Sequence, residues 1–339
     1  MDATPPLRRP TIRDVARTAG VSKSLVSLVY ANPASVSTER RQRVLAAAEE
    51  LGFHPNTVAR SLAGTDGNFV GILVADLHNP VFPEIVDATR RELARIGEVS
   101  LMTSATLPGE PDRHVLDDRV LALFRDLRPR GILIVGSVPD MPAVAALAAT
   151  SALVVASAIA DHLPTARTVR GDDAAGMRLV VDHLVGLGHR DIAHIGGEGG
   201  LVAVARARAY EQAMTANGLA EHVRVVPADY SENSGHAAAE HLLLGSRPPT
   251  AITAVNDLAA VGALAAAAER GLRVSVTGYD DTYLAALRQI SLTTIDPGNE
   301  AIGRRAAQLL SKAGPGDTEQ LDDLIAPSLR IRSSTGPPV

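Results

Sequence analysis

The spacing of apolar residues predicts a helical segment near the start of the chain. Between positions 11 and 52, apolar side chains recur every three or four residues, which is the period of a helix that buries one face. Capping residues and helix breakers divide this stretch into three short helices. We expect these helices over residues 12–19, 23–31 and 37–51.

The second of these helices has two chemically different faces. Ser22 can cap its start, and at 100° per residue its apolar side chains fall on one arc. The opposite arc carries Lys23, Ser24, Ser27 and Leu28. The preceding helix, which Thr11 and Asp14 can cap, ends at Gly20, so only a tight turn separates the two helices. This arrangement is typical of a helix-turn-helix, whose second helix enters the major groove of DNA.

The distribution of charge favours a DNA-binding interpretation of this segment. The net charge of the 339 residues is −5. Residues 1–64 nevertheless carry nine basic and five acidic residues, a net of +4, whereas the remainder carries 24 basic and 33 acidic residues, a net of −9. A basic N-terminal module on an acidic core is typical of a DNA-contacting head. The alternative, a three-helix packing unit with a solvated face, does not account for this split.

Beyond residue 68 the pattern changes to short apolar runs that alternate with helical segments. This alternation predicts doubly wound parallel sheets, and the number of units predicts two lobes. In such sheets, ligands bind in the crevice at the carboxyl ends of the strands. We expect strands over residues 69–75, 98–104, 131–135, 153–156, 192–195, 223–226, 251–254 and 274–277.

Several classes of protein are disfavoured by the same sequence. The uncharged stretch between Asp140 and Asp161 has the length of a membrane span, but a helix over 143–149 followed by a strand explains it better. The first residues lack the apolar core of a signal peptide, so we expect a cytoplasmic protein. The chain has no Cys, and its His residues form no metal-binding pair. We therefore expect no metal and no other cofactor.

Residues 11–64, TIRDVARTAGVSKSLVSLVYANPASVSTERRQRVLAAAEELGFHPNTVARSLAG, resemble the LacI/GalR family of bacterial transcription regulators. The resemblance continues over nearly the whole chain. It implies an all-α helix-turn-helix head and a two-lobed α/β body like that of periplasmic binding proteins. It also implies a homodimer, most often a repressor, that binds a pseudo-palindromic operator in double-stranded DNA and responds to a small-molecule effector.

The resemblance also assigns DNA contacts. In the family, the segment after His54-Pro55 is a hinge helix that orders on operator DNA and inserts a Leu into the minor groove. By position this Leu is Leu62; a plain linker is the alternative interpretation. Many relatives carry Arg where this chain has Leu28. We expect contacts with DNA from Thr11, Arg13, Ser22, Lys23, Ser24, Ser27, Leu28, Asn32, Asn56, Ala59, Arg60 and Leu62.

An effector site is implied by segments that follow the expected strands and match the family. The resemblance gives Arg206 and Asp280 to ligand hydroxyls, Asn256 to a further hydrogen bond and Tyr230 to stacking on the ligand face. Charged groups bind polyols well, and an aromatic ring covers the apolar face of a sugar. The chain departs from the family at Gly136, Ser157 and Glu198. The full set of expected effector contacts is His78, Asn79, Phe82, Arg206, Tyr230, Asn256 and Asp280.

Enzymatic readings have weaker support. The glycines of residues 196–200 resemble a phosphate-binding loop, but the third Gly of GxGxxG and the GK[ST] of a P-loop are missing. Asp280 and Asp281 could form a carboxylate pair, although ligand binding or a turn is the better interpretation. A solute-binding protein or a sugar-processing enzyme with the same two-lobed body is the rival to a regulator. Neither rival explains residues 11–62.

The sequence therefore predicts a transcriptional regulator that is not an enzyme. We expect a tail over residues 1–10, the helix-turn-helix domain over 11–54 and the hinge with its linker over 55–67. Residues 68–339 would form the effector-binding and dimerisation domain. The expected effector is a sugar or polyol, and no contact with a membrane is expected.

Overall fold

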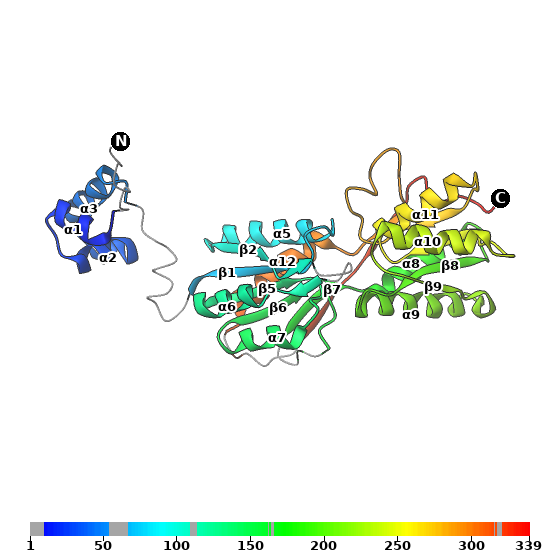
Figure 1. Ribbon diagram of the computed structural model, residues 1–339, viewed down its shortest axis with the longest axis horizontal. Helices are drawn as coiled ribbons and strands as arrows, with labels where there is room; N and C mark the ends of the chain where they lie inside the picture. The colour runs from blue at the N-terminus through cyan, green and yellow to red at the C-terminus, as the bar shows by residue number, and fades with distance from the viewer. Residues whose placement is uncertain are drawn as a thin grey trace, which may run out of the picture. The chain divides into compact units, whose positions relative to one another are not determined.

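The computed structural model describes residues 10–53, 67–108, 114–161, 163, 166–314, 316 and 321–339. The chain divides into two compact units, Met1–Thr65 and Asp66–Val339, which we call the head and the body (Figure 1). Asn56, Ala59, Arg60 and Leu62, together with the expected tail over residues 1–9 and most of the expected hinge, lie outside the described residues.

The head consists of three helices, as the apolar spacing predicts: α1 (Ile12–Ala19), α2 (Lys23–Ala31) and α3 (Thr38–Glu50). The expected caps are confirmed. The backbone N–H and the hydroxyl of Thr11 donate to Asp14 at 2.9 and 2.6 Å, and the Ser22 hydroxyl accepts from the backbone N–H of Leu25 at 3.1 Å. Gly20 ends α1 in a left-handed conformation with φ 64°, which a residue without a side chain adopts at little cost.

A small apolar core holds the three helices of the head together. Val15 and Val44 are fully buried, and α2 contributes Val26 and Val29 to the same cluster. Because these residues recur at helical spacing, each helix has one buried face and leaves its other face to solvent. On α2 the solvent-facing side chains are those of Lys23, Ser24, Ser27 and Leu28, as expected.

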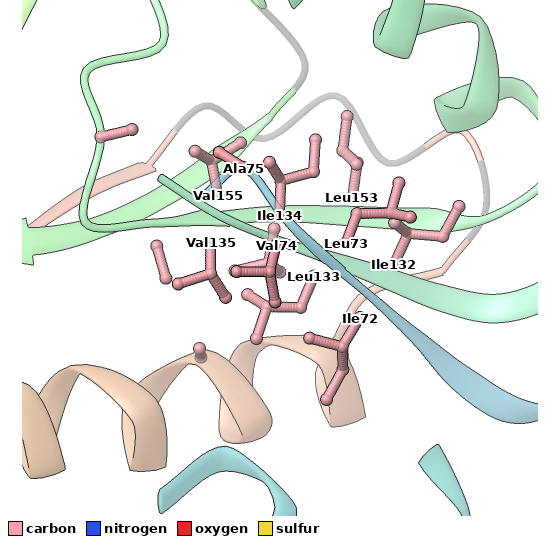
Figure 2. Packing of buried hydrophobic residues seen from close by; sticks show 14 of the residues in the cluster. Ile72, Leu73, Val74, Ala75, Ile132, Leu133, Ile134, Val135, Leu153 and Val155 are labelled. Atoms are coloured by element: carbon pink, nitrogen blue, oxygen red, sulfur yellow. The ribbon is translucent and has the colours of Figure 1, made fainter. Parts of the chain in front are cut away.

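The first lobe of the body is built on a six-stranded sheet with the order β13-β7-β6-β5-β1-β2, and all its pairings are parallel. Its apolar core lies around β1, β5 and β6, where Ile72, Leu133 and Val155 are fully buried (Figure 2). The strands are β1 (Gly67–Val74), β2 (Ser100–Ser104), β5 (Pro129–Val135), β6 (Ala152–Ala156), β7 (Arg167–Gly171) and β13 (Leu321–Ile325). The helices of this lobe are α5 (Phe82–Arg95), α6 (Asp118–Leu127), α7 (Met141–Ala145) and α12 (Asn299–Lys312).

The second lobe has a four-stranded parallel sheet with the order β11-β10-β8-β9. Its strands are β8 (Ile192–Gly197), β9 (Val225–Ala228), β10 (Ala251–Ala254) and β11 (Ser275–Thr277). Its helices are α8 (Asp173–Gly186), α9 (Leu201–Ala216), α10 (Glu232–Leu244) and α11 (Asp257–Glu269). The chain passes between the two lobes from β7 to α8, from β12 (Thr294–Asp296) to α12, and from β13 to β14 (Ser328–Arg330).

The expected two-lobed α/β class is confirmed, but several strands carry too little apolar character to be predicted. β7 and β13 pair with one another at the edge of the larger sheet, where Arg170 and Thr168 bind Asp322. A short hairpin of β3 (Thr106–Pro108) and β4 (His114–Leu116) was also not expected.

The uncharged stretch before Asp161 forms α7, a 3₁₀ turn (Ala146–Ala149) and β6. Within the described part of the chain, no helix is long and apolar enough to cross a membrane.

Candidate effector site and nucleic-acid interface

A cavity of about 190 Å³ lies in the body between segments of both lobes. The first lobe contributes residues that follow the carboxyl ends of β1, β5 and β6, and the second lobe contributes residues that follow β8, β9 and β11. This is the position that parallel sheets favour for a ligand, because the loops after the strands converge there. The lining residues are Ala75, Asp76, Asn79, Val81, Phe82, Ser137, Pro139, Ser157, Gly199, Val202, Arg206, Tyr230 and Asp280.

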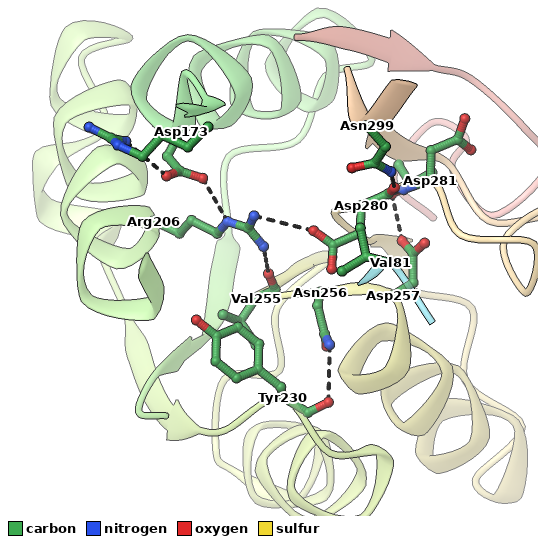
Figure 3. A network of polar contacts seen from close by, with 12 residues as sticks. Val81, Asp173, Arg206, Tyr230, Val255, Asn256, Asp257, Asp280, Asp281 and Asn299 are labelled. Atoms are coloured by element: carbon green, nitrogen blue, oxygen red, sulfur yellow. Dashed lines mark hydrogen bonds and ion pairs between the residues drawn. The ribbon is translucent and has the colours of Figure 1, made fainter. Parts of the chain in front are cut away.

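Arg206 of α9 is the centre of the polar network at this cavity (Figure 3). Its side chain is 7% exposed, and its guanidinium donates from Nε to Asp173 at 2.8 Å and from Nη2 to Asp280 at 3.2 Å. The third bond runs from Nη1 to the Val255 carbonyl at 2.7 Å. The guanidinium carbon also lies 3.6 Å from the centre of the Tyr279 ring, a cation–π contact. These contacts fix the orientation of the one basic side chain among the described lining residues.

Acidic groups outnumber basic groups around Arg206. Burial alone would lower the pKa of Arg206, but the carboxylates of Asp280 and Asp173 raise it above its ordinary value. Burial, opposed by Arg206, raises the pKa of Asp280 to about 6. Burial and then the charge of Asp280 raise the pKa of Asp257 to about 7. Among the described residues that line the cavity, the one positive charge, on Arg206, is already paired with Asp173 and Asp280 and is not free to attract an anion. Burial and neighbouring carboxylates make the ionised forms of Asp257 and Asp280 unfavourable.

Helix ends and one unusual backbone conformation place these carboxyl groups. Asp173 and Asp257 begin α8 and α11, where the helix dipole favours a negative charge. Asp280 follows β11 with φ 110°, a conformation that costs free energy for a residue with a side chain. The Asn299 amide at the start of α12 donates to the Asp280 carbonyl at 2.9 Å and to Glu84 of α5 at 3.0 Å. Asn299 thereby links the cavity to the helices of the first lobe.

The aromatic side of the cavity depends on a glycine. A Cβ atom at Gly136 would lie 2.4 Å from the Phe82 ring, and the residue has φ 86°. A larger residue at position 136 would displace the ring that lines the cavity. The position of the Phe82 ring therefore requires the glycine at position 136, one of the sites where the chain departs from the family. Ser157, a second departure, lines the cavity with φ 56°.

The structure brings most of the expected effector residues together. Asn79, Phe82, Arg206, Tyr230 and Asp280 all line the cavity. Two of the expected residues are not among the lining residues, and their placement gives no support for the contacts expected of them.

The side chain of His78 is 88% exposed and lies 3.5 Å from Asp76. Asn256 is buried, and both ends of its amide bind within the chain: Oδ1 accepts from the Ala259 N–H at 2.9 Å, and Nδ2 donates to the Tyr230 carbonyl at 3.0 Å. Asn256 thus caps α11 and binds the backbone of Tyr230, which lines the cavity.

Sequence reasoning missed Asp173, which binds the Arg206 Nε, and Tyr279, which stacks on its guanidinium. Asp173 comes two residues after β7, a strand that the apolar pattern did not reveal. The helix-capping Asp172 beside it was a local signal for the start of α8. The pairing with Arg206 spans 33 positions and needs the folded lobe, so no local sequence pattern predicts it.

The head presents the expected DNA-facing side chains on one exposed surface of α2. Lys23, Ser24, Ser27 and Leu28 are exposed, and so are Arg13 and Asn32 nearby in the chain. Leu28 is 39% exposed and therefore does not pack into the core of the head. Ser22 is exposed and Thr11 half-buried, and the side chains of both are also used as helix caps.

A helix-turn-helix head joined to a two-lobed body with a polar cavity defines a ligand-responsive, DNA-binding regulator. Comparison with known protein families agrees with this class. Residues 11–56 match the model for bacterial regulatory proteins of the lacI family, and residues 181–335 match the periplasmic binding protein-like domain.

Individual relatives match over the whole length. The lactose operon repressor of Escherichia coli (strain K12) is 30% identical over 331 residues, covering 96% of this chain and 90% of the relative. The transcriptional repressor PurR of Haemophilus influenzae (strain PittEE) is 30% identical over 339 residues, covering 96% and 98%. A crystal structure of the lac repressor dimer bound to operator and the anti-inducer ONPF has a TM-score of 0.83 at 28% identity, covering 97% and 100%. The chain belongs to the lacI family of bacterial regulatory proteins.

Proposed function

We propose that the protein is a cytoplasmic transcriptional repressor that binds a pseudo-palindromic operator as a homodimer and changes its operator affinity when a sugar or polyol occupies the cavity of the body. The observation that carries the effector half of this proposal is the buried Arg206–Asp280 pair at the cavity wall. Paired charged groups fixed in this way bind vicinal hydroxyl groups through directed hydrogen bonds. The basic helix-turn-helix head supports the proposed binding to operator DNA.

The composition of the cavity supports a sugar-like ligand. Phe82 and Tyr230 offer aromatic surface for the apolar face of a ring, while Asn79, Ser137 and Ser157 offer neutral hydrogen-bonding groups. A relative of this chain, the lac repressor, was crystallised with both operator and the anti-inducer ONPF. This precedent supports the proposal that the head binds DNA and the body binds a small molecule. The regulatory role needs no catalytic step, and we propose that the protein is not an enzyme.

The domain roles follow the same proposal. Residues 11–54 would bind the operator, and residues 55–67 would form the hinge and linker. Residues 68–339 would bind the effector and form the dimer, and residues 1–10 would be an N-terminal tail. A closing or opening movement of the two lobes around the ligand would alter how the hinge orders on DNA.

A comparison of the full chain with a chain that lacks the first 64 residues tests the proposed function. The full chain should select a palindromic DNA sequence from a random pool and retard it in a gel, whereas the shortened chain should retard no DNA. Both chains should show the same increase in melting temperature with a sugar found by screening. A full chain that retards no selected DNA would favour the rival function of a solute-binding or sugar-processing protein.

The hinge can be tested at Leu62. If Leu62 inserts between base steps in the minor groove, Leu62→Ala removes the apolar wedge that stabilises the bent operator. We expect operator affinity to fall at least about tenfold, roughly 1.4 kcal/mol, with no change in melting temperature or in ligand affinity. Fluorescence anisotropy with the selected operator measures the effect. Leu107→Ala, at an exposed position of the body, is the matched control and should bind normally. An unchanged operator affinity of the Leu62 variant would rule out the wedge.

A further inference from the structure

Leu28 is an apolar side chain on the polar face of α2. Its exposed fraction is 39%, whereas Val26 and Val29 of the same helix are 0% and 3% exposed. Ser24 lies one turn before Leu28 on the same face, and both are open to solvent. An exposed Leu among serines contributes little to the core of the head. Its position on the outer face of the second helix instead places it where a base edge would lie.

The chemistry of α2 limits how this helix can read DNA. Two-pronged hydrogen bonds to bases come from Arg or Lys on guanine and from Asn or Gln on adenine, and Asp or Glu can accept a hydrogen bond from cytosine. The nine residues KSLVSLVYA contain Lys23 as the one side chain of this set. The serines can donate or accept single bonds to several bases, so they discriminate weakly. Beyond Lys23 and these serines, sequence discrimination by α2 depends on a contact of another kind.

We propose that Leu28 reads the C5-methyl group of a thymine in each operator half-site. This inference rests on the proposed DNA-binding function. In the major groove, thymine is the base that presents a methyl group, and an apolar side chain gains free energy by covering it. A cytosine or guanine at the same place would turn its exocyclic polar group toward Leu28 and lose water without gaining a hydrogen bond. The contact therefore selects thymine, and it can also cover the methyl group of 5-methylcytosine, which retains the polar amino group of cytosine.

Replacing thymine by uracil tests this contact, because the two bases differ by the methyl group alone. The full chain first selects its operator from a random pool, and each thymine is then replaced by uracil symmetrically in both half-sites. Covering one methyl group is worth about fourfold in affinity, so the replacement should weaken binding about fifteenfold for the dimer. We expect this loss at one position of the half-site in the wild-type protein, and no loss at that position in Leu28→Ala.

A matched variant and a methylated base complete the test. Leu45→Ala changes a similarly exposed Leu of α3, 45% exposed, and should retain the full uracil effect. When the thymine is replaced by cytosine, affinity should fall, and 5-methylcytosine should restore part of it in the wild-type protein but not in Leu28→Ala. Anisotropy at fixed salt measures all of these affinities.

Three results would overturn the inference. The first is a uracil scan without any loss that depends on Leu28. The second is a 5-methyl group on cytosine that leaves affinity unchanged. The third is a guanine that is strictly required opposite residue 28 and is still required in Lys23→Ala. Failure of the proposed function has a different signature: the full chain then selects no DNA sequence at all.

Discussion

Arg206→Ala should lower the free energy of unfolding of the body by about 3–5 kcal/mol and abolish ligand binding. The substitution leaves Asp280, about 5% exposed, without the positive charge that it binds in the wild-type protein, and leaves the equally buried Asp173 with Arg170 as its remaining cationic partner, at 3.4 Å. Removing one partner of a buried ion pair strands the other charge in a poorly solvated place, which is far more costly than losing the pair's own attraction. The cation–π contact with Tyr279 and the bond to the Val255 carbonyl are lost as well.

Urea unfolding of the wild-type and variant chains at neutral pH measures this loss. Arg304→Ala is the matched control, because its ion pair with Glu300 at 3.0 Å lies at the surface, where the Arg304 side chain is 52% exposed. Surface pairs contribute at most about 1 kcal/mol, so the control should unfold almost as the wild-type protein does. If Arg206→Ala cost no more than Arg304→Ala, the network around Arg206 would not be the electrostatic centre of the site.

Arg206→Lys separates the loss of charge from the loss of geometry. A lysine keeps the positive charge near Asp280 and Asp173, but it cannot reproduce the planar, three-way arrangement of bonds that the guanidinium makes. We expect this variant to recover part of the stability and to remain unable to bind the sugar identified by thermal-shift screening. DNA binding at saturating protein should be retained, because the head has its own core.

Local signals explain why the head was predictable in detail. The caps of α1 and α2 involve residues three positions apart, and the valines of the core recur at helical spacing, so neighbours in sequence decide the structure. The interior strands of the body were predictable for a related reason: residues 70–74 of β1, residues 131–135 of β5 and all of β6 are buried and carry no polar side chain.

Long-range pairing explains what was missed. β13 alternates between half-buried and exposed residues, and it becomes a strand because it pairs with β7, which lies some 150 positions earlier. Asp173 acquires its role in the same way, from an arginine on another helix. Asn256 shows the converse case: an amide at a strand end is typical of a ligand contact, but both ends of this amide bind the backbone of its own lobe, so its placement does not support the expected contact.

The contribution of Asp257 to the stability of the body should fall as pH rises from about 4 to 7. Burial raises the pKa of this group from the ordinary 3.8 to about 7, so the folded protein holds the proton more tightly than the unfolded chain does. The proton's contribution to stability is therefore complete below the unfolded pKa and is lost as pH rises through the folded pKa. Asp280, with its pKa raised to about 6, acts in the same direction. Three histidines whose pKa values burial lowers act in the opposite direction: His194, with its pKa lowered to about 3, and also His183 and His189.

Comparison with Asp257→Asn isolates the contribution of this one carboxyl group from those of the other titrating groups. The amide can keep the local hydrogen bonds, because its oxygen can accept from Thr282 while its nitrogen donates to the hydroxyl of Thr294, which now accepts. A variant with no proton to lose should be more stable than the wild-type protein at pH 8, by an amount on the order of 1–3 kcal/mol, and should show no such gain at pH 4. Urea unfolding at pH 4, 5, 6, 7 and 8 measures both curves, and Glu300→Gln, at a side chain that is 70% exposed, should run parallel to the wild-type protein. Parallel curves for Asp257→Asn would mean that the pKa of Asp257 is the same in the folded and the unfolded chain, which would contradict the raised pKa of this buried carboxyl group.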